Sequence, residues 1–446
     1  MESPVRRALQ VLATMLVAGA ARSVAQAPAP VPLSFAEAVS RAAGTAPSVA
    51  IAGLQVDAAD ARVRQARGPL LPSLTLSSAW VNRSFNSHAL GIQFPEQAGV
   101  PELVGPFDNF DARVGATQTL FDFASIKRVH AARAQADGSG AERSVVVESA
   151  ARATAVAYLR AARATASASA RRADSAIAAE LVRLAAAQKA AGVSAAIDLT
   201  RARTQLAVSA GLLLVAQNQS DRARLELGRT LGLDPTTPIV LADTLSSGLA
   251  AADVPAQRDS AIARGVAARP DLQAEVARGL AARTTGSAIA AERLPRLSLE
   301  GDVGVNGPTV PGAIFTRQIG VAVSIPILDG FRREGRLAEQ QAIASVSELR
   351  EHDLRQQIAA EVEAALIELR SVEAQQAITA ERMRLAEDEL AQARERFAAG
   401  VAGNIEVINA QASLLQARDA DIDARFGAAI ARVALASAVG VARTLH

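Results

Sequence analysis

Residues 294–305 read LPRLSLEGDVGV, and residues 71–80 read LPSLTLSSAW. Each stretch opens with a Leu-Pro pair and then alternates apolar with polar residues. This is the pattern of a β-strand with one apolar and one polar face. Two later stretches alternate in the same way, the first of them more weakly, and each follows one of the Leu-Pro stretches. The sequence therefore predicts two separated hairpins, with strands at about 71–81, 112–121, 295–305 and 316–327.

Each predicted strand has about 10 residues, the length that a tilted strand needs to cross a bilayer. A half-buried sheet in a soluble protein alternates in the same way, so alternation by itself leaves both options open. An isolated hairpin is only marginally stable and leaves open edges, which disfavours the soluble option. The segments 82–109 and 304–316 are rich in Gly, Pro and Asn and are predicted to be loops.

The two halves of the chain repeat one order of landmarks. Pro47 recurs as Pro270, and the motif Ala-Ala-Gly-Val at 190–193 recurs at 398–401. Such self-similarity indicates a duplicated structural unit. Each half is predicted to hold two short helices, two strands and two long helices. The first repeat spans 28–232, the second spans 258–446, and the Pro-, Thr- and Asp-containing segment 233–257 links them.

Four long helices are predicted at 122–192, 196–231, 330–399 and 404–440. Proline is absent from 122–192 and from 327–446, and a helix of 330–399 would extend roughly 100 Å. Apolar residues recur at heptad spacing, which requires partner helices along the seam. Many seam positions are alanine and bury little area, so we expect several seams and a closed ring of helices. One such seam comprises Ile358, Val362, Ala365, Leu369 and Val372.

The composition excludes several classes of protein. Half of the residues are hydrophobic but only 3% are aromatic, which disfavours a large aromatic core. The chain carries 47 basic and 45 acidic residues, so it lacks the basic excess of a nucleic-acid-binding protein. It contains no cysteine, which rules out disulfides and thiolate chemistry.

The N-terminal residues 1–27 have the features of a secretory signal peptide. Arg6 and Arg7 precede a short apolar stretch at 8–20, and Ala25-Gln26-Ala27 offers a cleavage site. The apolar stretch is shorter than the roughly 20 residues of a membrane-spanning helix. We therefore expect an exported protein, with a surface-lying membrane helix as the less favoured interpretation.

The polar residues suggest no catalytic, cofactor or metal site. The histidines at 88, 130, 352 and 446 are scattered along the chain. The acidic run Asp419, Asp421 and Asp423 lacks the glycine and the closing glutamate of a calcium loop. We expect this run to lie on a solvated or lumen-facing helix surface.

The order of elements resembles that of the TolC-type outer-membrane efflux protein family, over nearly the whole mature chain. No single motif is strong, but their order, twice over, is specific. The matching motifs are Leu33-Ser34-Phe35-Ala36-Glu37-Ala38-Val39, Ala46-Pro47, the Leu-Pro-x-Leu strand starts, the turns Leu120-Phe121-Asp122 and Ile327-Leu328-Asp329-Gly330, and the Ala-Ala-Gly-Val tips.

The resemblance implies an α+β membrane protein of the outer membrane with a periplasmic extension. Three protomers would each give four strands to a 12-stranded transmembrane β-barrel, continuous with a periplasmic α-helical barrel. A physical argument also favours a trimer, because four strands cannot close a barrel alone and identical copies would supply the missing partner strands. The implied function is the channel of a tripartite efflux or type I secretion system, for small molecules such as drugs or metal ions. Its implied partners are a periplasmic adaptor, an inner-membrane pump and outer-membrane lipid.

The candidate site residues lie near the two Gly-Val tips. Asp198 and Glu406 follow Gly192 and Gly400 at the same spacing, and rings of such carboxylates in a trimer would favour cations. By resemblance, Glu406 and Asn409 match the constriction positions of the family, where two acidic residues are usual. Also by resemblance, Phe397 matches an aromatic residue that helps to close the tip, and Ala402 replaces a basic partner.

Each of these positions has a structural alternative. Asp198 and Glu406 both begin a helix, where a carboxylate suits the helix dipole. The tips Gly192-Val193 and Gly400-Val401, expected to dock on the adaptor, also have the residues of an ordinary helix end. For the whole chain, the alternatives are an exported soluble coiled-coil protein and, less favoured, an exported enzyme. The signal peptide and the strands of bilayer length favour the channel.

Overall fold

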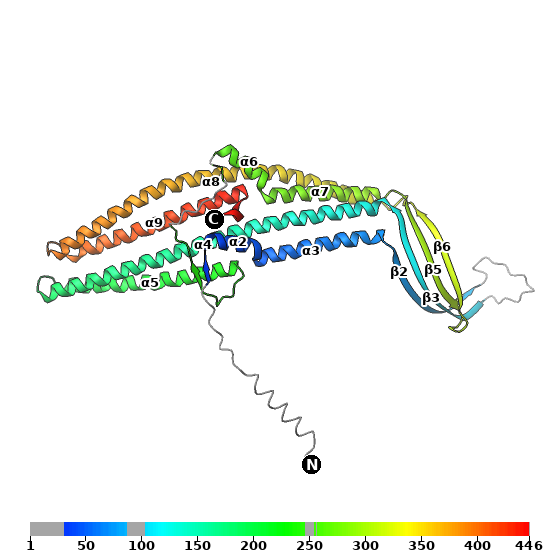
Figure 1. Ribbon diagram of the computed structural model, residues 1–446, viewed down its shortest axis with the longest axis horizontal. Coiled ribbons are helices and arrows are strands. Elements are labelled where there is room, and N and C mark those ends of the chain that lie inside the picture. The colour runs from blue at the N-terminus through cyan, green and yellow to red at the C-terminus, as the bar shows by residue number, and fades with distance from the viewer. Residues whose placement is uncertain (1–30, 87–102, 246–253, 256, 446) are drawn as a thin grey trace, which may run out of the picture. The chain divides into compact units, whose positions relative to one another are not determined.

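The structure, a computed structural model, describes residues 31–86, 103–245, 254–255 and 257–445 (Figure 1). The predicted signal peptide lies outside these residues. The chain forms two compact units, and three of the four long helices contribute residues to both. The first unit comprises Met1–Ala38, Thr154–Gly248 and Ile378–Phe426, and the second comprises Val39–Ala153, Leu249–Ala377 and Gly427–His446.

The second unit contains one four-stranded antiparallel sheet in the order β2-β3-β5-β6. The prediction of two separated hairpins is therefore wrong. Strand β3 pairs with β5 from Phe110 opposite Gly307 to Asp122 opposite Arg296. This pairing satisfies backbone groups that two separate hairpins would leave unpaired. The strands are β2 (Ser73–Asn86), β3 (Leu103–Asp122), β5 (Arg296–Gly307) and β6 (Ile314–Ser324).

Strands β2 and β3 extend well into the predicted loop 82–109, so that prediction is wrong at both ends. Their polar residues suggested a loop, but they pair with each other across the strands. Asn82 lies opposite Asp108, and its Nδ2 donates to Asp108 Oδ1 over 2.9 Å. Strand β6 ends at Ser324, earlier than predicted and just before Pro326, which has no backbone N–H for a ladder.

The helices begin at residues whose local chemistry favours a helix start. Pro47 and Pro270 occupy the first turn of α3 and α7, where a missing N–H costs nothing. Asp122 caps α4 by accepting the Ser125 N–H over 3.1 Å, and Asp329 accepts the Arg333 N–H over 3.2 Å at the start of α8. The helices are α2 (Phe35–Thr45), α3 (Pro47–Arg67), α4 (Phe123–Ala190), α5 (Ala196–Thr230), α6 (Arg258–Ala268), α7 (Pro270–Ala291), α8 (Arg332–Ala398) and α9 (Asn404–Val439).

The heptad positions form the core. In the second unit, Ile358 and Val362 of α8 are fully buried and pack with residues of α6, α7 and α9. Helix α6 approaches so closely that a Cβ on Gly265 would lie 3.0 Å from the Ile358 side chain. None of the helices in the described part of the chain has a stretch long and apolar enough to cross a membrane.

In the first unit, an ionic network joins α4 to α9. Arg171 donates to both carboxylate oxygens of Asp419, over 2.5 and 2.6 Å, and to Asp174 over 3.1 Å. Asp174 also accepts from Arg418. The side chains of Arg171 and Asp174 are each only 12% exposed. Burial alone would lower the pKa of Arg171, but its hydrogen bonds to the two aspartates outweigh this and raise the pKa.

The first unit also contains a short parallel strand pair, β1 (Val31–Leu33) and β4 (Ile239–Leu241), which the sequence patterns did not predict. Tyr158 of α4 is 1% exposed beside this pair, and its hydroxyl lies 3.0 Å from Leu33 O and 3.2 Å from Asp243 Oδ2. Asp243 also accepts the Phe35 N–H over 2.6 Å. The predicted linker 233–257 thus contributes strand β4 to a packed unit. Through Asp243 it also provides a hydrogen-bond acceptor for the start of α2.

Burial raises the pKa of Tyr158 to about 12, from 10.0 for an exposed tyrosine, and this predicts a loss of stability at alkaline pH. The unfolded chain releases the phenol proton near pH 10, before the folded chain does. The contribution is therefore complete below pH 10 and is lost as pH rises toward 12, by roughly 2–3 kcal/mol in total. The variant Tyr158→Phe should lose about 1–2 kcal/mol at pH 8 and show a flatter profile between pH 10 and 12.

Chemical unfolding followed by circular dichroism at several pH values tests this expectation. Tyr158 is the only tyrosine in the chain, so phenolate absorbance reports its ionisation directly. Parallel alkaline profiles for the two proteins would contradict it.

Candidate functional site

The register of the sheet collects apolar side chains on one face. Leu76 lies opposite Val114, and Val114 opposite Val303. The alternation continues along the strands, and Gln118 of β3 and Arg317 of β6 are polar exceptions on this face. Many of the apolar side chains are exposed in the protomer, for example Ile319 at 80% and Leu74 at 77%. We call this set the apolar face: Leu74, Leu76, Trp80, Phe110, Val114, Leu297, Leu299, Val303, Val305, Phe315, Ile319, Val321 and Val323.

The opposite side of the sheet, the polar face, carries hydroxyl and charged side chains. Arg113 lies at its centre and donates to Asp302 over 3.0 Å and to Asp111 over 2.6 Å. An exposed apolar surface of this extent is unusual on a monomeric soluble protein. The polar face comprises Thr75, Ser77, Asp111, Arg113, Glu300, Asp302, Thr316 and Gln318.

The sheet is open at both sides. Strand β2 pairs only with β3, and β6 pairs only with β5, within the described part of the chain. Two edges of 14 and 11 residues therefore present backbone N–H and C=O groups with no strand beside them. Open edges of this length are normally covered or paired.

The two tips have the same backbone geometry. Gly192 and Gly400 adopt φ angles of 75° and 73°, which favour glycine. The following residues, Val193 and Val401, donate their N–H to Gln188 O and Arg396 O, each over 3.0 Å. These bonds close the last turns of α4 and α8 in the Schellman pattern. Both valines are more than 70% exposed, so each tip presents an apolar residue to solvent.

The two predicted tip carboxylates have different surroundings. Glu406 is half-exposed, and its Oε2 lies 3.1 Å from Arg396 Nε, so a basic partner offsets its charge. The Asp198 side chain is only 15% exposed and accepts the Ser194 hydroxyl over 2.9 Å. Asp198 therefore contributes mainly to the local structure at the start of α5.

Of the other predicted constriction residues, Asn409 is exposed whereas Phe397 is buried. Phe397 is 2% exposed and packs in the core of the tip with Leu181, Leu390 and Val407. Within the protomer Phe397 therefore packs inside the tip, and its place at the constriction stays a prediction.

Two hydrogen bonds connect the α4–α5 tip to the α8–α9 tip. Gln188 Nε2 donates to Phe397 O over 2.8 Å, and Asn404 Nδ2 donates to Asp198 O over 2.6 Å. Asn404 is fully buried, and its Oδ1 has no hydrogen-bond partner among the described residues. No local sequence pattern singles out Asn404, because an asparagine after a glycine is common at any helix start.

The acidic run on α9 forms ion pairs. Asp419 binds Arg171, Asp421 pairs with Arg425 on the next turn, and Asp423 pairs with Arg163 of α4. No group of three or more potential metal ligands comes together in the part of the chain that the structure describes.

Comparison with known proteins relates this chain to outer-membrane efflux proteins. The model of a family described as outer membrane efflux protein matches residues 38–233 and 262–441. Protein CyaE of Bordetella pertussis is 27% identical over 393 residues, 86% of this chain and 79% of that protein. The pyoverdine export outer membrane protein OpmQ of Pseudomonas putida is 27% identical over 403 residues, 86% of this chain and 82% of that protein.

Among solved structures, the outer membrane protein VceC of Vibrio cholerae superposes with a TM-score of 0.71 at 20% identity. The match covers 91% of this chain and 96% of VceC. At this identity the likeness concerns the fold, which both chains share over nearly their whole lengths.

Proposed function

Because this chain belongs to the outer membrane efflux protein family, we propose that it assembles as a homotrimer into a conduit that carries small molecules out of the cell. The chain is an outer-membrane efflux component, with a periplasmic extension. The trimer, its closed barrel and its partners are the proposal. Residues 1–27 would direct its export and be removed.

The observation that carries the proposal is the open, two-faced sheet. Backbone groups in lipid must all be paired, so four strands with two free edges cannot stay alone in a bilayer. Edge β6 of one copy beside edge β2 of the next closes a 12-stranded barrel around a threefold axis. The apolar face then lies against lipid, and the polar face with Arg113 lines water.

The internal repeat supports a ring of helices beneath such a barrel. The family matches the chain in two segments, and each contains two strands and two long helices. The exposed Val193 and Val401 at the tips would dock on a periplasmic adaptor, which in turn joins an inner-membrane pump. Drugs or metal ions are the proposed cargo class, and type I secretion would use the same outer-membrane part.

Purification in non-ionic detergent followed by native mass spectrometry and planar-bilayer recording tests the conduit. We expect a trimer with a steady conductance. The competing proposal, an exported soluble coiled-coil protein, requires recovery from the periplasm without detergent and no conductance. A detergent-solubilised protein that stays monomeric and silent would refute the conduit.

The pair Arg396–Glu406 predicts how the tip selects ions, if three copies of Glu406 surround the passage. Replacing Arg396 by Gln leaves the carboxylate uncompensated, so cation preference should increase, by about two- to fivefold for an exposed pair. Glu406→Gln should lower the cation preference. Reversal potentials in a KCl gradient measure the preference. Arg394→Gln, on the same helix turn, is the matched control, and identical potentials for all variants would exclude Glu406 from the conducting path.

A further inference from the structure

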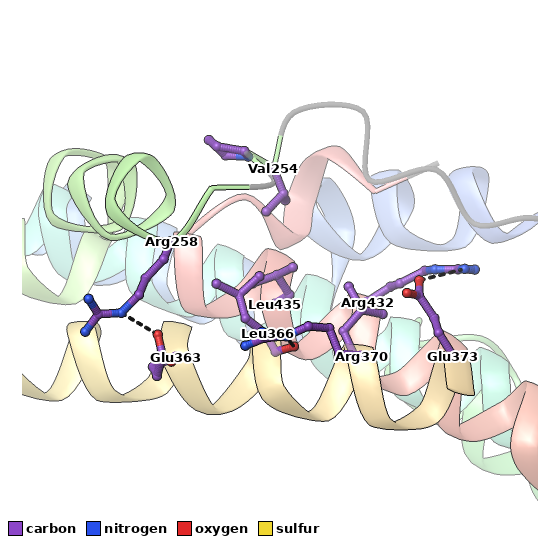
Figure 2. A pocket seen from close by; sticks show the side chains of 10 residues that line it. Val254, Arg258, Glu363, Leu366, Arg370, Glu373, Arg432 and Leu435 are labelled. Atoms are coloured by element: carbon purple, nitrogen blue, oxygen red, sulfur yellow. Dashed lines mark hydrogen bonds and ion pairs between the residues drawn. The ribbon is translucent and has the colours of Figure 1, made fainter. Parts of the chain in front are cut away.

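The second unit contains a cavity of about 620 Å³ between α8, α9 and the segment that leads into α6 (Figure 2). This volume lies within the range of small-molecule sites. The described residues of its lining belong neither to the sheet nor to the tips. An inference about it therefore does not depend on the proposed conduit.

The floor of the cavity is apolar. Leu435 of α9 is 6% exposed and belongs to the core that contains Ile358 and Val362. Leu366 and Leu369 of α8 are half-buried and pack against the same core, as does Val254. Figure 2 shows Leu366 and Leu435 side by side, with Val254 across from them. The floor is therefore anchored by the packed interior.

Ion pairs bound the cavity at two ends (Figure 2). Arg258 Nε lies 2.6 Å from Glu363 Oε2, and Arg432 Nη2 lies 3.7 Å from Glu373 Oε1. Both glutamates of the lining thus have an arginine partner. They repel an incoming anion less than free carboxylates would.

The third arginine of the lining, Arg370, has no carboxylate partner among the described residues. Its Nε donates to Leu366 O, one turn back on α8, over 3.2 Å. A guanidinium carries five N–H donors in a planar fork, so most of its donors remain available. The described residues of the lining include three arginines and two glutamates, and Arg258 also lies 3.5 Å from Asp259. The uncompensated positive charge beside the apolar floor is therefore that of Arg370.

We propose that this cavity binds an amphiphile with a single anionic head group, a carboxylate or a phosphate monoester. The guanidinium of Arg370 pairs with the head group, and the apolar chain lies on Leu366, Leu369 and Leu435. A cation would meet uncompensated Arg370, and an uncharged chain would leave that arginine unpaired. A polyanion would need more than one unpaired positive charge in the cavity to balance its own charges.

Titration of the purified full-length protein with octanoate tests the proposal. The protein is kept in a non-ionic detergent, and ¹³C-labelled octanoate carboxylate is followed by NMR. We expect octanoate to bind about tenfold more tightly than octanol or octyltrimethylammonium, since a charge-assisted bidentate pair forms only with the anion. Arg370→Gln should weaken octanoate binding about tenfold. Arg350→Gln, an exposed arginine of α8 outside the lining, is the matched control and should bind as the wild type does.

Octyl phosphate distinguishes the two head groups. Competition with octanoate, lost in Arg370→Gln, shows that the site accepts both. Absence of competition restricts the proposal to carboxylates. Octanol binding equal to that of octanoate, or unchanged octanoate binding by Arg370→Gln, would overturn the assignment. Displacement of octanoate by inorganic phosphate alone would remove the role of the apolar floor.

Discussion

A cysteine at position 322 should react rapidly with a membrane-impermeant maleimide in outer membranes, whereas a cysteine at position 321 should react roughly a hundredfold more slowly. Val321 lies on the apolar face of β6, and the next residue, Ala322, lies on the other face. Lipid disfavours the thiolate that attacks maleimide, so the thiol of Val321→Cys stays protonated and unreactive. The thiol of Ala322→Cys faces the water of the proposed lumen.

The chain has no cysteine of its own, so each variant carries a single thiol. Both positions are exposed in the isolated protomer, which removes burial within the chain as a cause of any difference. Denatured samples provide the control and should react at equal rates. Equal rates in native membranes would contradict the assignment of the apolar face to lipid, whatever the oligomeric state.

Replacing Arg171 by methionine should lower the free energy of unfolding by about 3 kcal/mol, because it leaves Asp419 without the bidentate partner that offsets its charge. Asp174 remains paired with Arg418 in this variant, and the Asp419 side chain is 42% exposed. We therefore expect a loss of stability at the lower end of the range for breaking a buried ion pair. The double variant Arg171→Met with Asp419→Leu should recover most of the loss, since no unpaired charge remains.

Chemical unfolding monitored by helical circular dichroism measures these effects. Arg183→Met is the matched control on α4, because the side chain of Arg183 is 74% exposed and pairs with Glu180 in solvent. A pair of that kind contributes under about 1 kcal/mol. An equal loss for Arg171→Met and Arg183→Met would show that the network makes no special contribution.

The local patterns predicted the helices and strands, but not how the strands join. The helix starts at Pro47 and Pro270 and the tips at Gly192 and Gly400 depend on backbone constraints of single residues, which are visible in any sequence. The extents of β2 and β3 were underestimated because Asn82 and Asp108 are polar. Their pairing across the strands compensates for that polarity.

For the candidate site too, the sequence indicated some residues but not the contacts between them. The exposed Glu406 follows from its spacing after the tip, and the exposed Asn409 was indicated by the family resemblance. The partner of Glu406, the burial of Phe397 and the bond from Asn404 to Asp198 do not, because they join residues of different helices. Tyr158 shows the same limit, since its hydroxyl lies beside Leu33 and Asp243, which are remote from it in sequence.

Periodicity and single-residue backbone preferences, both short-range properties, were therefore enough to predict the long helices and the alternating strands from sequence alone. The order of the motifs indicated the family by resemblance. Only the tertiary structure decided that four strands form one sheet, which side chains share its mostly apolar face, and which arginine neutralises which carboxylate. The physical reason is that register and ion pairing depend on the path of the chain between distant residues, and no local pattern records that path.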